Sequence, residues 1–407
     1  MKGFIMRFLS DPPFYYALIV ALMFIASLIG GIGYILYYPM LFFICFYYNR
    51  GIKRNNINSV FGFFLLACVM SVLLNTILPV FKAPFRLFAY TILIFAVTPV
   101  LFSKQKAVMC FKFLQYTCLL LVGVGFMNYY MYQAGILELQ EGNRVFAGTI
   151  GTNYLGMLCS IGILYMGSLL LYHKALLKKQ IFLFAGLLIG LLLCLLLSSS
   201  RNSIVSIIIS TLVMIYIQKK GKWGKALVLF VVLAIVIIVT FPFWEEYIVG
   251  IIDKQDGNTE SFNMRSREGS WEIRWKEFVS SPIFGIGFAS VSNPTTFSLA
   301  TGIVETTTGW GGLVSQLGLM GGIPFFLLTY KNMKYLLTRK DGRYVHCLLG
   351  ALLTFFCINS IGEGYITTVG CQFTVYFLLV QGIVYTLHKR WITVDSFVPL
   401  FFKIKRI

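Results

Sequence analysis

Residues 245–309 read EEYIVGIIDKQDGNTESFNMRSREGSWEIRWKEFVSSPIFGIGFASVSNPTTFSLATGIVETTTG, the one long interval without a membrane-length apolar run. Nine apolar stretches of membrane length precede it and three follow. The chain has 407 residues, of which 58% are hydrophobic and only 12% charged, about half the charged fraction of a soluble protein. Lipid-exposed backbone must satisfy its own hydrogen bonds, and no alternating strand pattern appears. The sequence therefore predicts an all-α polytopic membrane protein with one large periplasmic loop between the ninth and tenth helices.

Twelve transmembrane helices are predicted, with the long loop as a separate domain. The spans are 14–31, 34–48, 59–78, 85–102, 113–134, 152–172, 181–197, 202–217, 226–244, 310–330, 345–360 and 369–387. The membrane body occupies residues 1–244, the periplasmic loop domain 245–309, and the last three spans with a basic cytoplasmic tail 310–407.

The charge distribution supports this arrangement. With the N-terminus inside and the spans alternating, twenty-five of the 34 basic residues and only three of the 15 acidic residues fall in inside segments. Because the net charge of +19 is concentrated in short loops on one side, it indicates positive-inside orientation rather than nucleic-acid binding. Both termini are predicted to be cytoplasmic.

No cofactor or metal site is predicted. None of the nine cysteines lies between residues 244 and 309, and their spacing indicates neither a disulfide framework nor metal ligands. The sequence contains no P-loop, GxSxG, HExxH or DxD motif. His173, His346 and His388 all map to the cytoplasmic side, so no outer histidine is available as a base.

Nine basic residues oppose the general bias, and Arg144 is one of them. It stands in EGNRVFAGTIGTNYLG, just before the sixth span, where Gly148, Gly151 and Gly156 permit tight turns and close backbone approach. Asn153 falls near the start of that span. The alternative to a functional role is a loop arginine that snorkels at the membrane interface.

Arg201 stands in LLLSSSRNSIVS, in a turn of only a few residues between the seventh and eighth spans. An arginine held at the membrane boundary is costly unless it faces protein, water or an anion. Ser198, Ser199 and Ser200 add hydroxyl groups to the same turn. The pattern favours function over a simple interfacial anchor.

Within the long loop, RSREGSWEIRWKEFVSSP is predicted to form an amphipathic helix that ends before Pro282. Trp271, Trp275 and Phe278 recur on one face. That face is expected either at headgroup depth or packed on the loop's own core. Three arginines of this segment are expected to face the membrane-proximal space: Arg265, Arg267 and Arg274. Guanidinium groups bind phosphate oxygens in a bidentate way, so a lipid phosphate or diphosphate is the expected ligand.

Two outer carboxylates are candidate bases. Glu305 lies immediately before the tenth span and Glu363 between the last two spans. Desolvation next to apolar runs would raise the pKa of either carboxyl and suit it to accept a proton from a sugar hydroxyl. Solvated loop carboxylates are the alternative.

Together these elements resemble the bacterial O-antigen ligase and polymerase superfamily. The elements that carry the resemblance lie in order along the chain: Arg144 with its glycine-rich turn and Asn153, the SSSRN turn with Arg201, Arg267 with Trp271 before Pro282 and GIG, and an acidic residue before GGLVSQLGLMGG. The resemblance implies a metal-independent integral-membrane glycosyltransferase that uses glycans on undecaprenyl diphosphate at the outer face of the inner membrane.

The resemblance also implies roles and partners. By the resemblance, Arg144, Arg201 and Arg267 would engage the diphosphate. From its position in the sequence, Glu305 is a candidate to orient or deprotonate the acceptor, and the candidate substrate contacts are Arg265, Arg274, Asn153 and Glu363. Membrane lipid, a chain-length regulator and a flippase are further partners.

One departure from the family pattern separates two activities. Ligases carry a histidine in the large loop near the tenth span, whereas residues 304–309 hold Glu305 and no histidine. This favours a polymerase over a ligase. A ligase, a protein O-oligosaccharyltransferase and a lipid-linked glycan flippase or other transporter stay open as alternatives.

Overall fold

A computed structural model of the chain describes most of the helical body and two parts of the long loop. The described residues are 9–29, 31–49, 59–75, 83–139, 146–172, 174, 176–220, 222, 224, 265–292, 308–339, 341–368 and 370–401. Within helices, the side chains of Ser59, Ala83 and residues 265–268 are not part of the description.

These residues form helices and irregular connections, with no β-strand among them. The helices follow in the order α2 (Pro12–Met23), α3 (Ala26–Ile29), α4 (Ile32–Tyr48), α5 (Ser59–Leu73), α6 (Ala83–Val97), α7 (Lys104–Gln133), α8 (Thr152–Leu171), α9 (Lys178–Leu197), α10 (Arg201–Gln218), α13 (Arg265–Ser280), α14 (Gly309–Thr338), α15 (Tyr344–Asn359) and α16 (Gln372–His388), with a final 3-10 turn η5 (Val394–Ser396).

The all-α fold of the prediction is confirmed for the described residues. Eleven of the twelve predicted spans fall on helices, and the remaining one, 226–244, lies outside the described residues. Five helices, α7, α8, α9, α10 and α14, are long and apolar enough to cross a membrane. The chain is thus a multi-pass membrane protein. The total of twelve crossings and the side on which the long loop lies remain predictions.

α7 begins nine residues before the predicted span at 113–134, because Ser103 caps it. The Ser103 hydroxyl accepts the Lys106 amide at 3.1 Å. The Lys106 side chain is buried, and its Nζ donates to Asn49 Oδ1 at 3.0 Å and to the Phe95 carbonyl near the end of α6. A cation among helix C-terminal carbonyls is stabilised by the helix dipole. A lysine-rich stretch that reads as a loop is therefore the first part of a helix.

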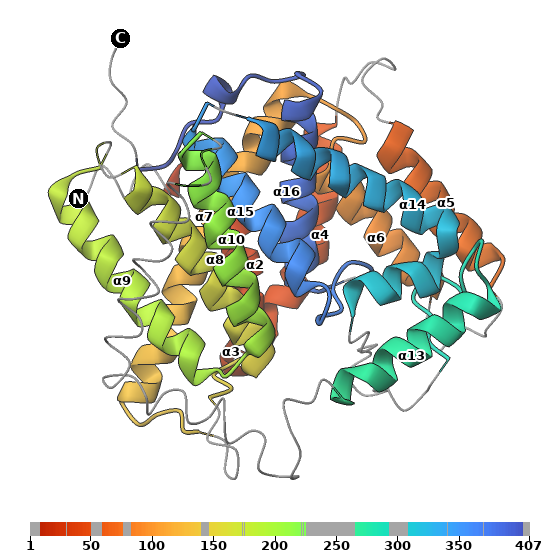
Figure 1. The fold of residues 1–407 in the computed structure, drawn as a ribbon, viewed down its shortest axis with the longest axis horizontal. Coiled ribbons are helices and arrows are strands. Elements are labelled where there is room, and N and C mark those ends of the chain that lie inside the picture. Colours follow the sequence, from red (N-terminus) through yellow and green to blue (C-terminus); the bar gives the residue numbers. More distant parts are fainter. Residues whose placement is uncertain are drawn as a thin grey trace.

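α15 and α16 are the most deeply buried helices, and nearly all of their side chains are covered. Figure 1 shows them inside the helical body, with α9 at one edge and α13 at the opposite edge. Peripheral helices keep large apolar side chains exposed, such as Phe182 of α9 and Phe88 of α6. Lipid tails are as apolar as these side chains, so such exposure is expected of a membrane body.

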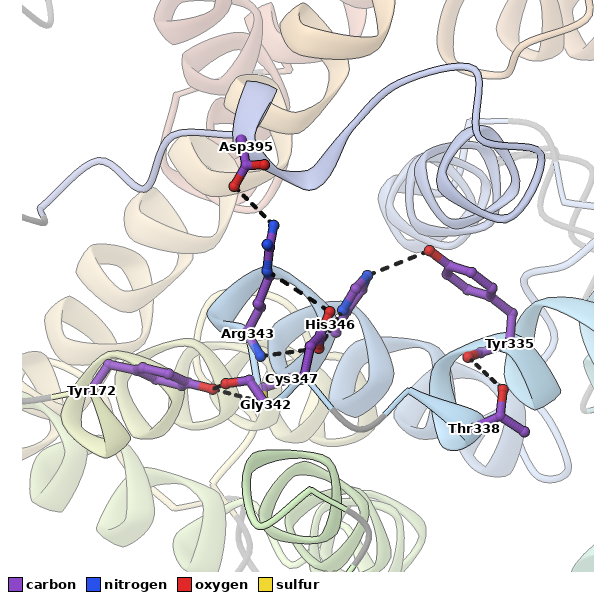
Figure 2. A network of polar contacts seen from close by, with 9 residues as sticks. Tyr172, Tyr335, Thr338, Gly342, Arg343, His346, Cys347 and Asp395 are labelled. Atoms are coloured by element: carbon purple, nitrogen blue, oxygen red, sulfur yellow. Dashed lines mark hydrogen bonds and ion pairs between the residues drawn. The ribbon is translucent and has the colours of Figure 1, made fainter.

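A polar network ties the α14–α15 connection to its surroundings at one end of the body, which we call the basic end (Figure 2). Arg343 Nη1 reaches Asp395 of η5 at 2.8 Å, and the buried His346 Nδ1 lies 2.9 Å from Asp341 Oδ1. The Tyr172 hydroxyl at the end of α8 donates to the Gly342 carbonyl. The network therefore joins α8, α14, α15 and the segment after α16.

α14 is broken at Gly318, whose φ of 58° and ψ of −160° are non-helical. The segment that follows α13 fills the break. The Ser315 carbonyl accepts the Ile286 amide at 2.9 Å, and the Leu319 amide donates to the Pro282 carbonyl at 2.8 Å. Irregular backbone at membrane depth requires such partners within the protein. The predicted continuous span at 310–330 is thus a broken helix that anchors the end of α13.

The variant Gly318→Ala should lose stability, because only glycine adopts this backbone conformation without strain. Its Cβ would lie 2.4 Å from the Ile283 carbonyl oxygen. Strained backbone alone costs about 1–3 kcal/mol. Thermal unfolding of the detergent-purified protein measures the loss. The control is Gly322→Ala, one turn further along α14, where the nearest atom is 3.5 Å away. Equal melting temperatures for the two variants would contradict the assignment of the break.

The variant Asp341→Asn should destabilise the basic end at neutral pH. Partial burial by itself would raise the pKa of Asp341, but the hydrogen bond and charge of His346 outweigh it, and the pKa lies below the ordinary value. Because the folded pKa is depressed, the stabilisation is present above the unfolded pKa of about 3.9 and is lost as the pH falls through the folded pKa. Melting temperatures of wild type and variant should therefore converge in acid. A constant difference between them at every pH would be inconsistent with this role.

Candidate functional site

The N-terminal ends of α8, α10, α14 and α16 gather around the connection between α15 and α16, residues 360–371, at the end of the body away from the basic end. The Asn202 side chain on α10 donates to the Asn359 carbonyl at 2.8 Å, and the Gly309 amide of α14 donates to the Ser360 carbonyl at 2.8 Å. On α16, the Thr374 hydroxyl donates to the Thr368 carbonyl at 2.8 Å. We call this region the site end.

α8 and α10 approach each other closely at the site end. A Cβ on Gly156 would lie 2.4 Å from Ser200 Cβ and 3.1 Å from Ser203 Oγ, which confirms the predicted close backbone approach. Asn153, on the first turn of α8, is half-buried. Because only a glycine allows this contact, the start of α8 packs directly against the start of α10.

The turn that carries Arg201 is strained and rich in polar groups. Ser199 has a φ of 50°, which is rare for a residue other than glycine. Its buried hydroxyl has no hydrogen-bond partner among the described residues, nor does the buried Oδ1 of nearby Asn359. Arg201 itself is half-buried and begins α10. Backbone strain and unsatisfied buried polar atoms together are typical of functional sites.

The glycine turn that follows Arg144 in the sequence is fixed against the same place. The Phe146 amide donates to the Leu197 carbonyl at 3.0 Å, just before the Arg201 turn. Gly148 and Gly151 have φ values of 56° and 90°, so the predicted tight turns are confirmed. Arg144 lies outside the described residues, and its place in the site stays a prediction.

Glu363 lies in the α15–α16 connection, half-buried, and its amide donates to the Asn359 carbonyl at 3.0 Å. Tyr154 of α8 is close enough to Glu363 for an electrostatic interaction, and its ring packs against Phe373 of α16 at 5.5 Å between centroids. The predicted carboxylate is thus placed between the ends of α8, α15 and α16. Glu305 lies outside the described residues.

α13 forms as predicted, but the expectation that Arg274 faces the membrane-proximal space is wrong, because its side chain is buried against the body. Trp271 and Trp275 are 39% and 64% exposed, whereas Arg274 and Glu277 are buried and form a 2.6 Å ion pair. Glu277 also accepts the amide and hydroxyl of Ser292. Exposed tryptophans fit a helix that lies at headgroup depth.

The buried pair positions α13 against the site end. Arg274 Cβ and Cγ are each 3.3 Å from the Cβ position of Gly311, in the first turn of α14. The predicted contact between Arg274 and substrate stays a prediction. The backbones of Arg265 and Arg267 begin α13, but their side chains lie outside the described part, so their predicted roles are not tested.

The arrangement suits an anionic ligand. α8, α10 and α16 have no side-chain N-cap hydrogen bond, so their first-turn N–H groups lack this partner. Helix N-termini carry roughly half a positive charge each and bind phosphate. Their dipoles add to the charge of Arg201. His346 and His388 both contact Tyr335 at the basic end, the opposite end of the body from this region.

Several residues of the site were not found from the sequence. Asn202, Asn359 and Ser360 connect the helix ends, and Tyr154 approaches Glu363. A polar pair such as Asn359–Ser360 at the end of an apolar run is a signal that could have found the α15 end. The convergence of several helix N-termini depends on tertiary packing and has no local signal.

Comparison with known families supports the resemblance. Residues 185–312 match the model of the family described as O-antigen ligase. The match begins within α9, includes the Arg201 turn and α13, and ends in the first turn of α14. It confirms the predicted relation to the O-antigen ligase and polymerase superfamily. No curated protein matches the chain.

The variant Arg274→Ala should detach α13 from α14, because it leaves the buried Glu277 carboxylate without its partner. Removing one member of a buried pair costs about 3–5 kcal/mol. The control on the same helix is Lys276→Ala, which removes the exposed 2.6 Å pair with Glu272 and should leave the protein unchanged. Limited proteolysis and thermal unfolding report both effects. An Arg274→Ala protein as resistant as Lys276→Ala would disprove the anchoring role.

Proposed function

We propose that this protein, a member of the O-antigen ligase and polymerase superfamily through residues 185–312, joins lipid-linked repeat units into a surface polysaccharide. The donor is a glycan on polyprenyl diphosphate, and the acceptor is the non-reducing sugar hydroxyl of a second lipid-linked unit. The reaction takes place at the outer face of the inner membrane, where the site end and the long loop lie. Both termini are then cytoplasmic, and a flippase and a chain-length regulator are its partners.

The observation that carries this proposal is the gathering of helix N-termini around the α15–α16 connection, with Arg201 at the first position of α10. Backbone N–H groups of these helix ends and the guanidinium group of Arg201 contribute positive charge there. A diphosphate is the anionic group that family members handle, and it fits a site built in this way.

In the proposed reaction, the acceptor hydroxyl oxygen attacks the anomeric carbon of the donor. The bond between that carbon and the diphosphate oxygen breaks, and the diphosphate leaves with the electron pair. Arg201, together with Arg144, stabilises the negative charge that develops on the leaving group, as preorganised electrostatic groups do. Arg267 assists from α13.

The proton of the acceptor hydroxyl passes to a carboxylate. Glu305 and Glu363 are the candidates, and Tyr154 and the end of α15 surround Glu363. Desolvation in such a position favours a carboxylate that accepts a proton in the reaction. Asn153 and Arg265 complete the proposed substrate contacts from α8 and α13, whereas the buried Arg274 holds α13 in place.

Transfer of the finished glycan to lipid A–core, or to a protein, is the second candidate reaction. The absence of a histidine from residues 304–309, and the position of His346 and His388 at the basic end, favour the polymerase. Transport of lipid-linked glycan needs a polar path through the body. Buried charged residues that the structure describes lie near the ends of the helices of the body, such as Lys106 in the first turn of α7 and Arg274 beside the first turn of α14. This position favours an enzyme.

The variant Arg201→Ala should abolish long polymer while lipid-linked single units persist. The loss of one such group reduces the rate by about 10²–10³-fold. Arg201→Lys should restore only part of the activity, since an ammonium group cannot reproduce the bidentate fork. Arg390→Ala, an exposed arginine at the basic end, is the control. Assay of purified protein with lipid-linked units measures chain length, and normal chains from Arg201→Ala would refute the assigned role.

A deletion strain separates the candidate reactions. Loss of a polymerase leaves core capped with one repeat unit. Loss of a ligase leaves polymer on the carrier lipid, and loss of a protein transferase leaves unglycosylated protein. Either of the last two phenotypes would overturn the proposed polymerase.

A further inference from the structure

A groove lined by aromatic rings runs between α4 and α6 and has a volume of about 520 Å³. Its walls include Tyr38, Phe42 and Phe46 of α4 and Phe85 and Phe88 of α6. Phe46 and Phe88 are each 58% exposed, so the groove is open at the periphery of the body. At 1.5 Å per residue, the α4 wall from Tyr38 to Phe46 is about 12 Å long. The site is thus an open, elongated apolar groove on the surface of the body rather than an enclosed cavity.

One end of the groove is polar and reaches the α15–α16 connection. A Cβ on Gly370 would lie 3.3 Å from the Tyr38 hydroxyl, and one turn earlier on α4 the Tyr34 hydroxyl accepts the Gln372 amide at 3.2 Å. Arg86, half-buried in the first turn of α6, interacts electrostatically with Tyr38.

The other end of the groove is apolar. Phe42 and Phe46 pack together there, with 4.4 Å between ring centroids. The groove thus has a positively charged end and an aromatic remainder. This combination matches an amphiphile with an anionic head and a long hydrocarbon chain.

We infer that this groove binds the isoprenoid chain of the acceptor lipid and that Arg86 holds the diphosphate of that lipid. The inference rests on the proposed polymerase function. A polymerase must bind two polyprenyl-linked substrates at once, whereas a ligase binds only one polyprenyl-linked substrate. The guanidinium fork of Arg86 suits two oxygens of a diphosphate.

The position of the groove agrees with the chemistry of an acceptor. Arg201 adjoins the start of the α15–α16 connection through Asn202 and Asn359, and Arg86 adjoins its end through Tyr38 and Gly370. The acceptor reacts through its non-reducing sugar, so its own diphosphate must lie about one repeat unit from the donor's anomeric carbon. Arg201 and Arg86 adjoin different ends of one connection and so provide two separate positions for a phosphate group.

A phospholipid is the alternative occupant. It has two acyl chains, whereas a polyprenyl lipid has a single chain to lay between two adjacent helices. Its phosphodiester also carries less charge than a diphosphate and offers fewer oxygens to Arg86. These differences predict that the groove selects polyprenyl diphosphate over phospholipid.

Photocrosslinking of the full-length protein in lipid nanodiscs tests the selection. Phe88→p-benzoylphenylalanine places the probe in the groove, and Phe182→p-benzoylphenylalanine places it on the lipid-facing surface of α9, where Phe182 is 80% exposed. The nanodiscs contain phosphatidylglycerol with a small fraction of undecaprenyl diphosphate. The fraction of undecaprenyl diphosphate among the lipids crosslinked by the groove probe should be well above its fraction in the nanodisc. The α9 probe should capture undecaprenyl diphosphate only in proportion to its fraction in the nanodisc. Adding Arg86→Gln should reduce the captured fraction about tenfold, as expected for a lost charged hydrogen bond.

Equal capture by the two probes, or capture unaffected by Arg86→Gln, would overturn the inference. The Arg201→Ala variant separates this failure from a failure of the proposed function. Selective capture at Phe88 in a protein whose Arg201→Ala variant still polymerises would support the groove and refute the catalytic assignment. Loss of polymer in Arg201→Ala together with unselective capture would refute the groove alone.

Discussion

The carbonyl oxygens at the end of α15 hold the site end together. The Asn359 carbonyl accepts the Asn202 side chain of α10, and the Ser360 carbonyl accepts the Gly309 amide of α14. The negative end of one helix dipole thus meets the positive ends of two others. In a body surrounded by lipid, these contacts also satisfy carbonyl groups that water cannot reach. The start of α14 is therefore fixed beside the start of α10, where Arg201 lies.

The break in α14 extends this arrangement to the long loop. Because Gly318 interrupts α14, the backbone of α14 has free amide and carbonyl groups at the break. The segment after α13 forms hydrogen bonds with these groups. The Arg274–Glu277 pair then packs α13 beside the first turn of α14. The loop helix is attached to the membrane body at two points, and its tryptophans are left facing outward. A helix held in this way can lie at headgroup depth without a large soluble domain.

Hydropathy was sufficient to predict the helical body, because each span has its own apolar run. The aromatic stripe of α13 and the glycine turns after Arg144 were predicted correctly for the same reason, since their signals are local. Tertiary features were not predictable. The break at Gly318 depends on a docking segment about thirty residues earlier in the chain, and the burial of Arg274 reverses the polarity expected for a soluble helix. The aromatic groove is composed of ordinary lipid-facing residues, so only the neighbouring Arg86 marks it.

In this account, two lipid-linked substrates lie on either side of one connection, and the helix ends that surround it bind the leaving diphosphate. The most direct test is a structure of the protein with undecaprenyl diphosphate in a lipid nanodisc, determined by electron cryomicroscopy. The account predicts diphosphate density within hydrogen-bonding distance of Arg201 and the first turns of α8 and α10. Diphosphate density bound only at the basic end, or only on lipid-facing surfaces away from the α15–α16 connection, would contradict it.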